Sequence, residues 1–319
     1  MSSDLALIKK TAQEIYSWMN PSPQISWPLL NQRTGCELWL KHENHNPTGS
    51  FKVRGGMNYL SKLKERSPNV TGVIAATRGN FGQSVAFACK RLKIKAVIVV
   101  PEGNNPDKNR AMIALGAEVI VRGKDFDESV TYASLLAEER QLHLMPSFHW
   151  DLVTGVATYA FELFTSTPNL DRIYVPIGLG SGICAVVKVR DLLGLATEVI
   201  GVVAENAPTY KLSFTAGELK PTSSADTMAD GLAVRNPNQD ALDIMLNGVE
   251  RIVSVTEDEL QCAVRVLFED THNLAEGAGA AAVAAVLQEG YLNSNLQVGA
   301  VLTGGNISKA ILIDALGSA

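Results

Sequence analysis

Short apolar segments rich in Val and Ile alternate along this chain with segments of helical periodicity. Seven such segments are expected to be strands: 72–76, 96–100, 119–121, 173–177, 199–203, 252–255 and 298–302. Each is nearly continuous in apolar residues, which is typical of strands covered on both faces. The alternation therefore predicts an α/β fold with mostly parallel sheets flanked by helices.

The segments between these strands predict helices and a division into two lobes. Helices are expected over 83–92, 107–115, 125–140 and 183–193; Asp107 and Asp125 are favourable N-caps for two of them. Residues 71–148 contain four strand–helix units and are expected to close as a small lobe. Residues 1–70 and 149–319 would then form a large lobe. Residues 215–238, rich in Thr, Ser, Ala, Pro and Asn, predict a long irregular loop.

The composition excludes several classes of protein. The 319 residues carry a net charge of −5, 46% are hydrophobic and 19% are charged, which indicates a globular chain without a basic face for nucleic acid. The longest apolar run, 278–287, is too short to span a membrane. The four cysteines form no CxxC pair, and Cys89 and Cys184, which lie in apolar helical surroundings, are expected to be buried thiols in a reducing compartment. No signal peptide is recognisable, so a cytoplasmic location is expected. A C-terminal regulatory domain is not expected.

Lys52 stands in an unusual setting for a lysine. It lies in the segment 46–56, Asn-Pro-Thr-Gly-Ser-Phe-Lys-Val-Arg-Gly-Gly, among hydroxyls, an aromatic residue and glycines. Glycines allow close approach of the backbone to a ligand, and an amine held there can form a Schiff base with a carbonyl cofactor. Taken alone, the segment also fits a turn that enters a helix.

A glycine-rich turn follows the predicted strand 173–177. Residues 178–182 read Gly-Leu-Gly-Ser-Gly and precede a predicted helix, and this arrangement favours an anion at the helix N-terminus. A dinucleotide is the first alternative, with Glu205 placed to bind a ribose, but Ile183 replaces the third glycine of that motif. Ser181 favours a terminal phosphate. A tight turn without a ligand is the second alternative.

Two further turns join predicted strands to helices. Residues 76–84 read Ala-Thr-Arg-Gly-Asn-Phe-Gly-Gln-Ser and offer N–H groups to a carboxylate; Asn80 suits a ring hydroxyl or a simple N-cap. Residues 301–306 read Val-Leu-Thr-Gly-Gly-Asn, which fits close approach to a flat ligand or a plain turn. Both turns are candidate parts of one site, since carboxyl ends of parallel strands face the same cleft.

These four motifs, in this order, resemble the fold-type II pyridoxal-phosphate enzymes, in particular the serine/threonine dehydratases and serine racemases. The resemblance covers nearly the whole chain. It implies the two-lobed fold of tryptophan synthase β-like enzymes, pyridoxal 5′-phosphate as cofactor, and conversion of an L-3-hydroxy amino acid to a 2-oxo acid and ammonia. Small-molecule amino acids are the implied partners, and a homodimer is compatible with the family. The alternatives are a racemase with side dehydratase activity and a nicotinamide-dependent oxidoreductase.

The resemblance also implies residue roles. Lys52 would be the catalytic Schiff-base lysine, with Phe51 against the ring, Asn80 at the ring 3′-oxygen and Thr303 at the pyridine nitrogen. Gly178, Leu179, Gly180, Ser181 and Gly182 would hold the phosphate, and Glu276 would lie near the ring. Ser50, Thr77, Arg78, Gly79, Asn80 and Phe81 would contact the substrate.

Three positions depart from the family pattern. Relatives usually carry serine where Arg78 stands, and in racemases that serine acts as a base, so racemase activity is expected to be weak or absent here. Arg78 would suit a second carboxylate on the substrate, as in 3-hydroxyaspartate. Alternatively, it pairs with a protein acid or reaches solvent. Phe81 replaces a common histidine, which favours a phenylserine-type substituent or is a packing change. Glu205 matches a family metal ligand, but Lys211 stands where the second acid belongs, so divalent-cation dependence is expected to be weak or altered.

Overall fold

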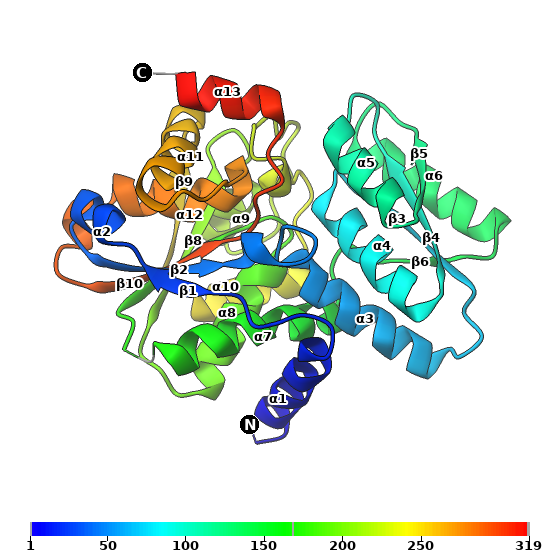
Figure 1. The fold of residues 1–319 in the computed structure, drawn as a ribbon, viewed down its shortest axis with the longest axis horizontal. Helices are drawn as coiled ribbons and strands as arrows, with labels where there is room; N and C mark the ends of the chain where they lie inside the picture. The colour runs from blue at the N-terminus through cyan, green and yellow to red at the C-terminus, as the bar shows by residue number, and fades with distance from the viewer. Residues whose placement is uncertain (1, 168, 318–319) are drawn as a thin grey trace.

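Two mostly parallel sheets form the framework of the molecule in a computed structural model that describes residues 2–167 and 169–317 (Figure 1). The larger sheet has six strands in the order β1-β2-β10-β7-β8-β9, and only the β1–β2 pair is antiparallel. The smaller sheet has four parallel strands in the order β5-β4-β3-β6. The strands are β1 (Gln24–Ser26), β2 (Glu37–His42), β3 (Gly72–Ala76), β4 (Lys95–Val100), β5 (Glu118–Val121), β6 (His143–Leu144), β7 (Arg172–Pro176), β8 (Glu198–Ala204), β9 (Arg251–Val255) and β10 (Gln297–Leu302).

Helices cover both faces of each sheet. The α-helices are α1 (Ser2–Tyr16), α2 (Pro28–Thr34), α3 (Lys52–Arg66), α4 (Asn80–Leu92), α5 (Pro106–Ala114), α6 (Phe126–Glu139), α7 (Trp150–Ser166), α8 (Ser181–Leu192), α9 (Thr209–Ala216), α10 (Gln239–Gly248), α11 (Glu257–Thr271), α12 (Gly277–Gln288) and α13 (Lys309–Gly317); the 3₁₀ turns are η1 (Glu43–His45), η2 (Asp230–Leu232) and η3 (Gly290–Leu292). One large core joins the six-stranded sheet to α11 and α12, and another joins its opposite face to α7 and α8. Among the described residues, no helix combines the length and apolarity that a membrane span requires.

All seven predicted strands are present, and the fold class is confirmed. Prediction missed β1, β2 and β6. In β2 the charged residues Glu37 and Lys41 interrupt the apolar pattern, although Lys41 is buried against Glu162. Asp125 caps α6 as expected, whereas α5 is capped by Asn105, so the expectation for Asp107 was wrong. Pro106 at the first helical position explains this shift of the cap by two residues, because its fixed φ suits the start of a helix.

The smaller sheet lies entirely between residues 72 and 144. Its core also contains Val53, Met57 and Leu60 of α3, which pack with β3 and α4. Helix α3 therefore connects the two sheets, as Figure 1 shows. The exact lobe boundaries at residues 71 and 148 stay a prediction.

Candidate active site

A cavity of about 400 Å³ lies where the strands of both sheets end. Residues that follow β3, β7 and β10 line it, as expected for a ligand site in a parallel α/β fold. The irregular loop 217–229 and η2 close one side, which agrees with the long loop predicted there. The cavity brings together Phe51, Lys52, Thr77, Arg78, Gly79, Asn80, Phe81, Gly178, Leu179, Gly180, Ser181, Gly182, Glu276 and Thr303.

Lys52 is the first residue of α3 and points its amine into this cavity. Its Nζ lies 3.5 Å from the Ser181 hydroxyl and 4.6 Å from the centre of the Phe51 ring. Ser84 holds the start of α3 by donating a 2.6 Å hydrogen bond to the Lys52 carbonyl. Burial lowers the pKa of Lys52 to about 8, although the charge of Glu276 opposes this shift. A substantial fraction of the amine is therefore neutral near physiological pH, as a nucleophile or base requires.

The glycine-rich turn between β7 and α8 forms a cradle beside Lys52. Gly180 has φ +100°, a left-handed conformation that favours glycine, and α8 begins at Ser181. A Cβ at Gly180 would lie 2.7 Å from that of Ala241, so a side chain does not fit. N–H groups in the first turn of a helix lack intrahelical partners and bind anions. The turn thus suits the phosphate group that the sequence predicted.

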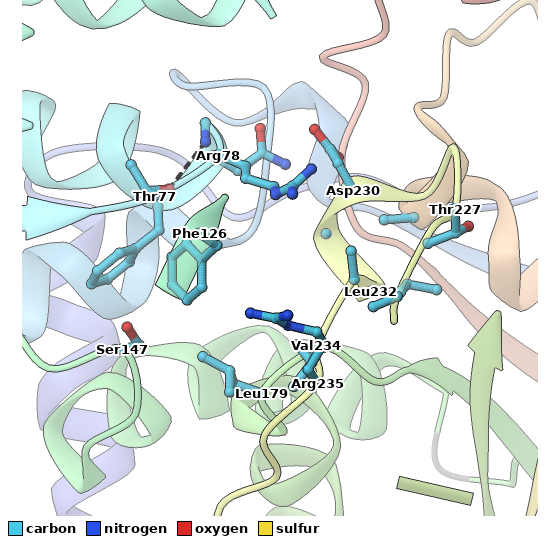
Figure 2. A pocket seen from close by; sticks show the side chains of 18 of the residues that line it. Thr77, Arg78, Phe126, Ser147, Leu179, Thr227, Asp230, Leu232, Val234 and Arg235 are labelled. Carbon is cyan, nitrogen blue, oxygen red and sulfur yellow. Dashed lines mark hydrogen bonds between the residues drawn. The ribbon is translucent and has the colours of Figure 1, made fainter. Parts of the chain in front are cut away.

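The loop after β3 offers a second set of donors. The Thr77 hydroxyl accepts a 3.0 Å hydrogen bond from the Gly79 N–H, as the dashed line in Figure 2 shows. That N–H is therefore engaged, and the free donors are those in the first turn of α4, which begins at Asn80. Gly79 has φ +156°, and a Cβ there would collide with the Lys108 side chain. Glycine is thus required where this loop passes Lys108.

A buried chain of polar groups runs from Asn80 across the cavity. The Asn80 amide donates to Glu276, and the other Glu276 oxygen lies 2.9 Å from Lys108 Nζ. Lys108 also pairs with Asp230 at 2.6 Å. Burial raises the pKa of Glu276, and Lys108 opposes this. Burial would lower the pKa of Lys108, but Glu276 and Asp230 outweigh it, so the pKa is raised. One Asn80 N–H remains for a ligand, since an amide carries two.

Thr303 and Ser50 lie at the end of β10. The Thr303 hydroxyl lines the cavity and lies 3.1 Å from the Ala278 carbonyl, while the Phe51 N–H donates to the Thr303 carbonyl at 3.0 Å. Ser50 pairs with Gly304 instead. Its hydroxyl is buried without a hydrogen-bond partner among the described residues, and Ser50 is not among those that line the cavity. The substrate contact predicted for Ser50 stays a prediction.

The outer part of the cavity contains two arginines (Figure 2). Arg78 is exposed and makes no hydrogen bond or ion pair within the described part of the chain. Arg235, from the loop after η2, pairs with Asp127 and, at 3.2 Å, with Asp125 at the start of α6. The backbone N–H of Glu128, with smaller contributions from Arg235 and Arg78, lowers the pKa of Asp125. Arg78 and Arg235 thus both act on one carboxylate.

Sequence reasoning missed several residues of this site. Lys108, Phe126, Asp230 and Arg235 line the cavity without belonging to a recognisable motif. Beneath the site, Arg54 is fully buried and pairs with Glu43 and Glu162 at 2.7 and 2.6 Å. Arg54 lies two residues after Lys52, but no local pattern identifies its partners, which lie 11 residues away at Glu43 and 108 residues away at Glu162.

Glu205 lies at the end of β8 and is exposed. Residues 2–167 and 169–317 contain no group of three His, Cys, Asp or Glu side chains arranged to hold a metal ion. The weak or altered metal dependence expected from Lys211 stays a prediction.

The residues of the cavity suit pyridoxal phosphate. An amine of lowered pKa, an anion cradle that excludes side chains and a hydroxyl at a strand end converge on one space. A family model described as pyridoxal-phosphate dependent enzyme matches residues 15–304.

Curated relatives and solved structures are similar over most of the chain. The L-threonine ammonia-lyase of Thermotoga maritima is 35% identical over 88% of this chain and 69% of its own. The catabolic L-threonine dehydratase of Escherichia coli is 32% identical over 87% and 85%. A processed threonine deaminase from Solanum lycopersicum has a TM-score of 0.91 at 30% identity, covering 99% and 94% of the two chains. A pyridoxal 5′-phosphate-dependent aspartate racemase has a TM-score of 0.91 at 29% identity, covering 97% of both.

Proposed function

The chain belongs to the pyridoxal-phosphate dependent enzymes, and from this premise we propose that it converts an L-3-hydroxy amino acid to a 2-oxo acid and ammonia by β-elimination. The main support for this proposal is Lys52, whose amine contacts Ser181 of the turn 178–182 and has a lowered pKa. When bound, the cofactor supplies an aldehyde for amines and a ring that withdraws electrons from the substrate Cα. The residues of the chain provide binding, orientation and proton transfer.

Each part of the cavity has a defined task in this reaction. N–H groups of the first turn of α4 receive the substrate carboxylate, while Gly178–Gly182 hold the cofactor phosphate. The neutral Lys52 Nζ removes the Cα proton. The Cβ–O bond then breaks, and the hydroxyl leaves as water after it receives a proton, for which the Lys52 ammonium group formed in the preceding step is the available donor. The enamine that is released hydrolyses to the 2-oxo acid and ammonia.

Thr303 supports elimination over transamination. It offers a neutral hydroxyl at the end of β10, where a carboxylate would hold a ring nitrogen protonated. A weaker electron sink stores less negative charge and favours prompt loss of the β-hydroxyl. Arg78 disfavours racemisation, because a guanidinium keeps its proton throughout the pH range of catalysis.

Reduction and mass analysis test the assignment of Lys52. The cofactor-loaded protein is treated with borohydride, digested and weighed; a pyridoxyl adduct is expected on the peptide that contains Lys52. Release of 2-oxo acid from L-serine and L-threonine is measured in parallel. Lys52→Ala should abolish both signals, whereas Lys62→Ala on the same helix, where Lys62 pairs with Glu65, should retain them. An adduct on another lysine, or 2-oxo acid formation by Lys52→Ala, would overturn the proposal.

A further inference from the structure

The outer part of the cavity has apolar walls contributed from both sides of the cleft. Figure 2 shows Phe126 on one side and Leu232 on the other. We call these walls the distal pocket, which consists of Phe81, Phe126, Leu179, Leu232 and Val234. Phe81 and Phe126 lie in the first turns of α4 and α6, next to the smaller sheet. Leu179 follows β7, Leu232 ends η2, and Val234 lies just after η2. The distal pocket lies in the same cavity as Lys52, and Leu179 belongs both to this pocket and to the turn 178–182.

The charges around the distal pocket compensate each other. Arg235 is engaged by Asp125 and Asp127, and Arg78 lies within electrostatic reach of Asp125. Two guanidinium groups therefore face two carboxylates, which leaves no net positive charge. The carboxylate common to all amino-acid substrates would add a further negative charge beside Arg78.

Deeper in the cavity, Lys52 is reserved for the cofactor and the other ammonium group is already paired. Lys108 is shared by Asp230 and Glu276, so two carboxylates face one ammonium group. Arg78 is a cavity guanidinium without an ion pair among the described residues, and it lies beside the first turn of α4, which would take the carboxylate common to all substrates. A second carboxylate on the substrate side chain would then find only Arg235, which Asp125 and Asp127 already engage. Desolvation of an unpaired carboxylate is costly, which argues against a 3-hydroxyaspartate-type substrate.

We propose that the distal pocket binds an uncharged, apolar β-substituent larger than methyl, with an aromatic ring as the best occupant. This inference rests on the proposed β-elimination and names the substrate class within it. Phenyl burial against Phe81, Phe126 and Val234 removes more apolar surface from water than a methyl group does. The flat guanidinium groups of Arg78 and Arg235 are compatible with an aromatic face, on which arginine stacks readily.

Substrate ranking tests the inference directly. 2-Oxo acid release is measured from L-phenylserine, L-threonine and L-3-hydroxyaspartate with the cofactor-loaded enzyme. We expect kcat/KM for phenylserine to exceed that for threonine by roughly tenfold or more, and hydroxyaspartate to rank last. Threonine or hydroxyaspartate in first place would overturn the inference and leave β-elimination intact. If the enzyme releases 2-oxo acid from none of these three substrates and none from L-serine, the proposed function itself is overturned.

A binding measurement separates recognition from chemistry. L-Phenylalanine, L-alanine and L-aspartate lack a β-hydroxyl and cannot undergo this elimination, so calorimetry can report their affinities for the loaded enzyme. Phenylalanine should bind most tightly and aspartate most weakly. Equal affinity for phenylalanine and alanine would contradict an apolar distal pocket.

Two variants from opposite sides of the pocket are used, so that the test remains possible if one of them does not fold. Phe126→Ala and Val234→Ala should each lower the preference for phenylserine over threonine by roughly fivefold or more, mainly through phenylserine. Leu135→Ala is the matched control, because Leu135 lies on the same helix as Phe126 with 64% of its surface exposed. An unchanged preference in folded Val234→Ala and Phe126→Ala would contradict the inference.

Discussion

Lys108 Nζ lies 2.9 Å from a carboxylate oxygen of Glu276, and both side chains are only 4% exposed. The two residues come from different parts of the fold, since Lys108 belongs to α5 beside the smaller sheet and Glu276 precedes α12 beside the larger one. Asp230 shares Lys108, and Asn80 shares Glu276. This buried ion pair therefore links the two sides of the cavity.

Loss of Lys108 should be strongly destabilising. Lys108→Met leaves Glu276 buried without its cation, which is expected to cost about 3 kcal/mol of unfolding free energy. Urea denaturation checks this, with Lys124→Met at an exposed position as the control. Lys108→Arg should recover part of the loss.

The pH dependence of that loss is a sharper measurement. Burial already raises the pKa of Glu276, and removal of Lys108 should raise it further. A carboxyl with a raised pKa in the folded state destabilises the fold above its unfolded pKa, and this penalty falls as the pH falls and the group is protonated. The stability difference between Lys108→Met and the unmodified protein should therefore shrink at acidic pH; a constant difference from pH 5 to 8 would contradict this account.

The activity of Lys52 should rise with pH through about 8. Burial lowers its pKa to that value, so the neutral amine that can remove a proton accumulates above it. We expect the reaction of the cofactor-free protein with a small aldehyde, scored at Lys52 by peptide mass, to follow a titration with its midpoint there. A midpoint near 10, as for an exposed lysine, would show that burial does not control this amine.

Because Arg78 stands in the cavity, we expect the enzyme to show little or no racemisation. Chiral chromatography of an incubation with L-serine should show 2-oxo acid formation without a comparable amount of D-serine, because a guanidinium cannot act as the base on the second face of the substrate. Arg78→Ser provides the comparison, since a hydroxyl at this position restores the residue type found in racemases. D-serine formed by the unmodified enzyme at the rate of pyruvate would contradict the prediction.

Chelation tests the metal expectation. Lys211 stands six residues after Glu205, where an acid would complete a cation site, and no three-ligand group exists among the described residues. We expect chelator to leave most of the 2-oxo acid formation intact. Complete loss that magnesium or calcium restores would show that Glu205 does take part in a cation site.

Local sequence was sufficient for the main elements of the fold. Strands such as β3 and β4 are covered on both faces, so all of their residues except the exposed Lys95 are apolar or small, and each segment can be recognised without its neighbours. The glycine-rich turn before α8 could be predicted for the same reason, because its conformation depends on residues that adjoin in sequence. β2 was missed because Glu37 and Lys41 interrupt its apolar pattern, and the burial of Lys41 depends on Ser22 and on Glu162, 121 residues away.

Long-range pairs account for the rest of the candidate site. Lys52 and the turn 178–182 were predicted as separate motifs, and folding brings Lys52 within 3.5 Å of Ser181. The pairing of Lys108 with Glu276 spans 168 residues, and that of Arg235 with Asp127 spans 108. Charged residues of this kind look like ordinary surface positions in sequence, because their environment is created by chain segments that meet only after folding. The amino-acid order therefore determined the class of fold and the residues able to do the chemistry, whereas packing of distant segments determined which charges remain unpaired in the cavity.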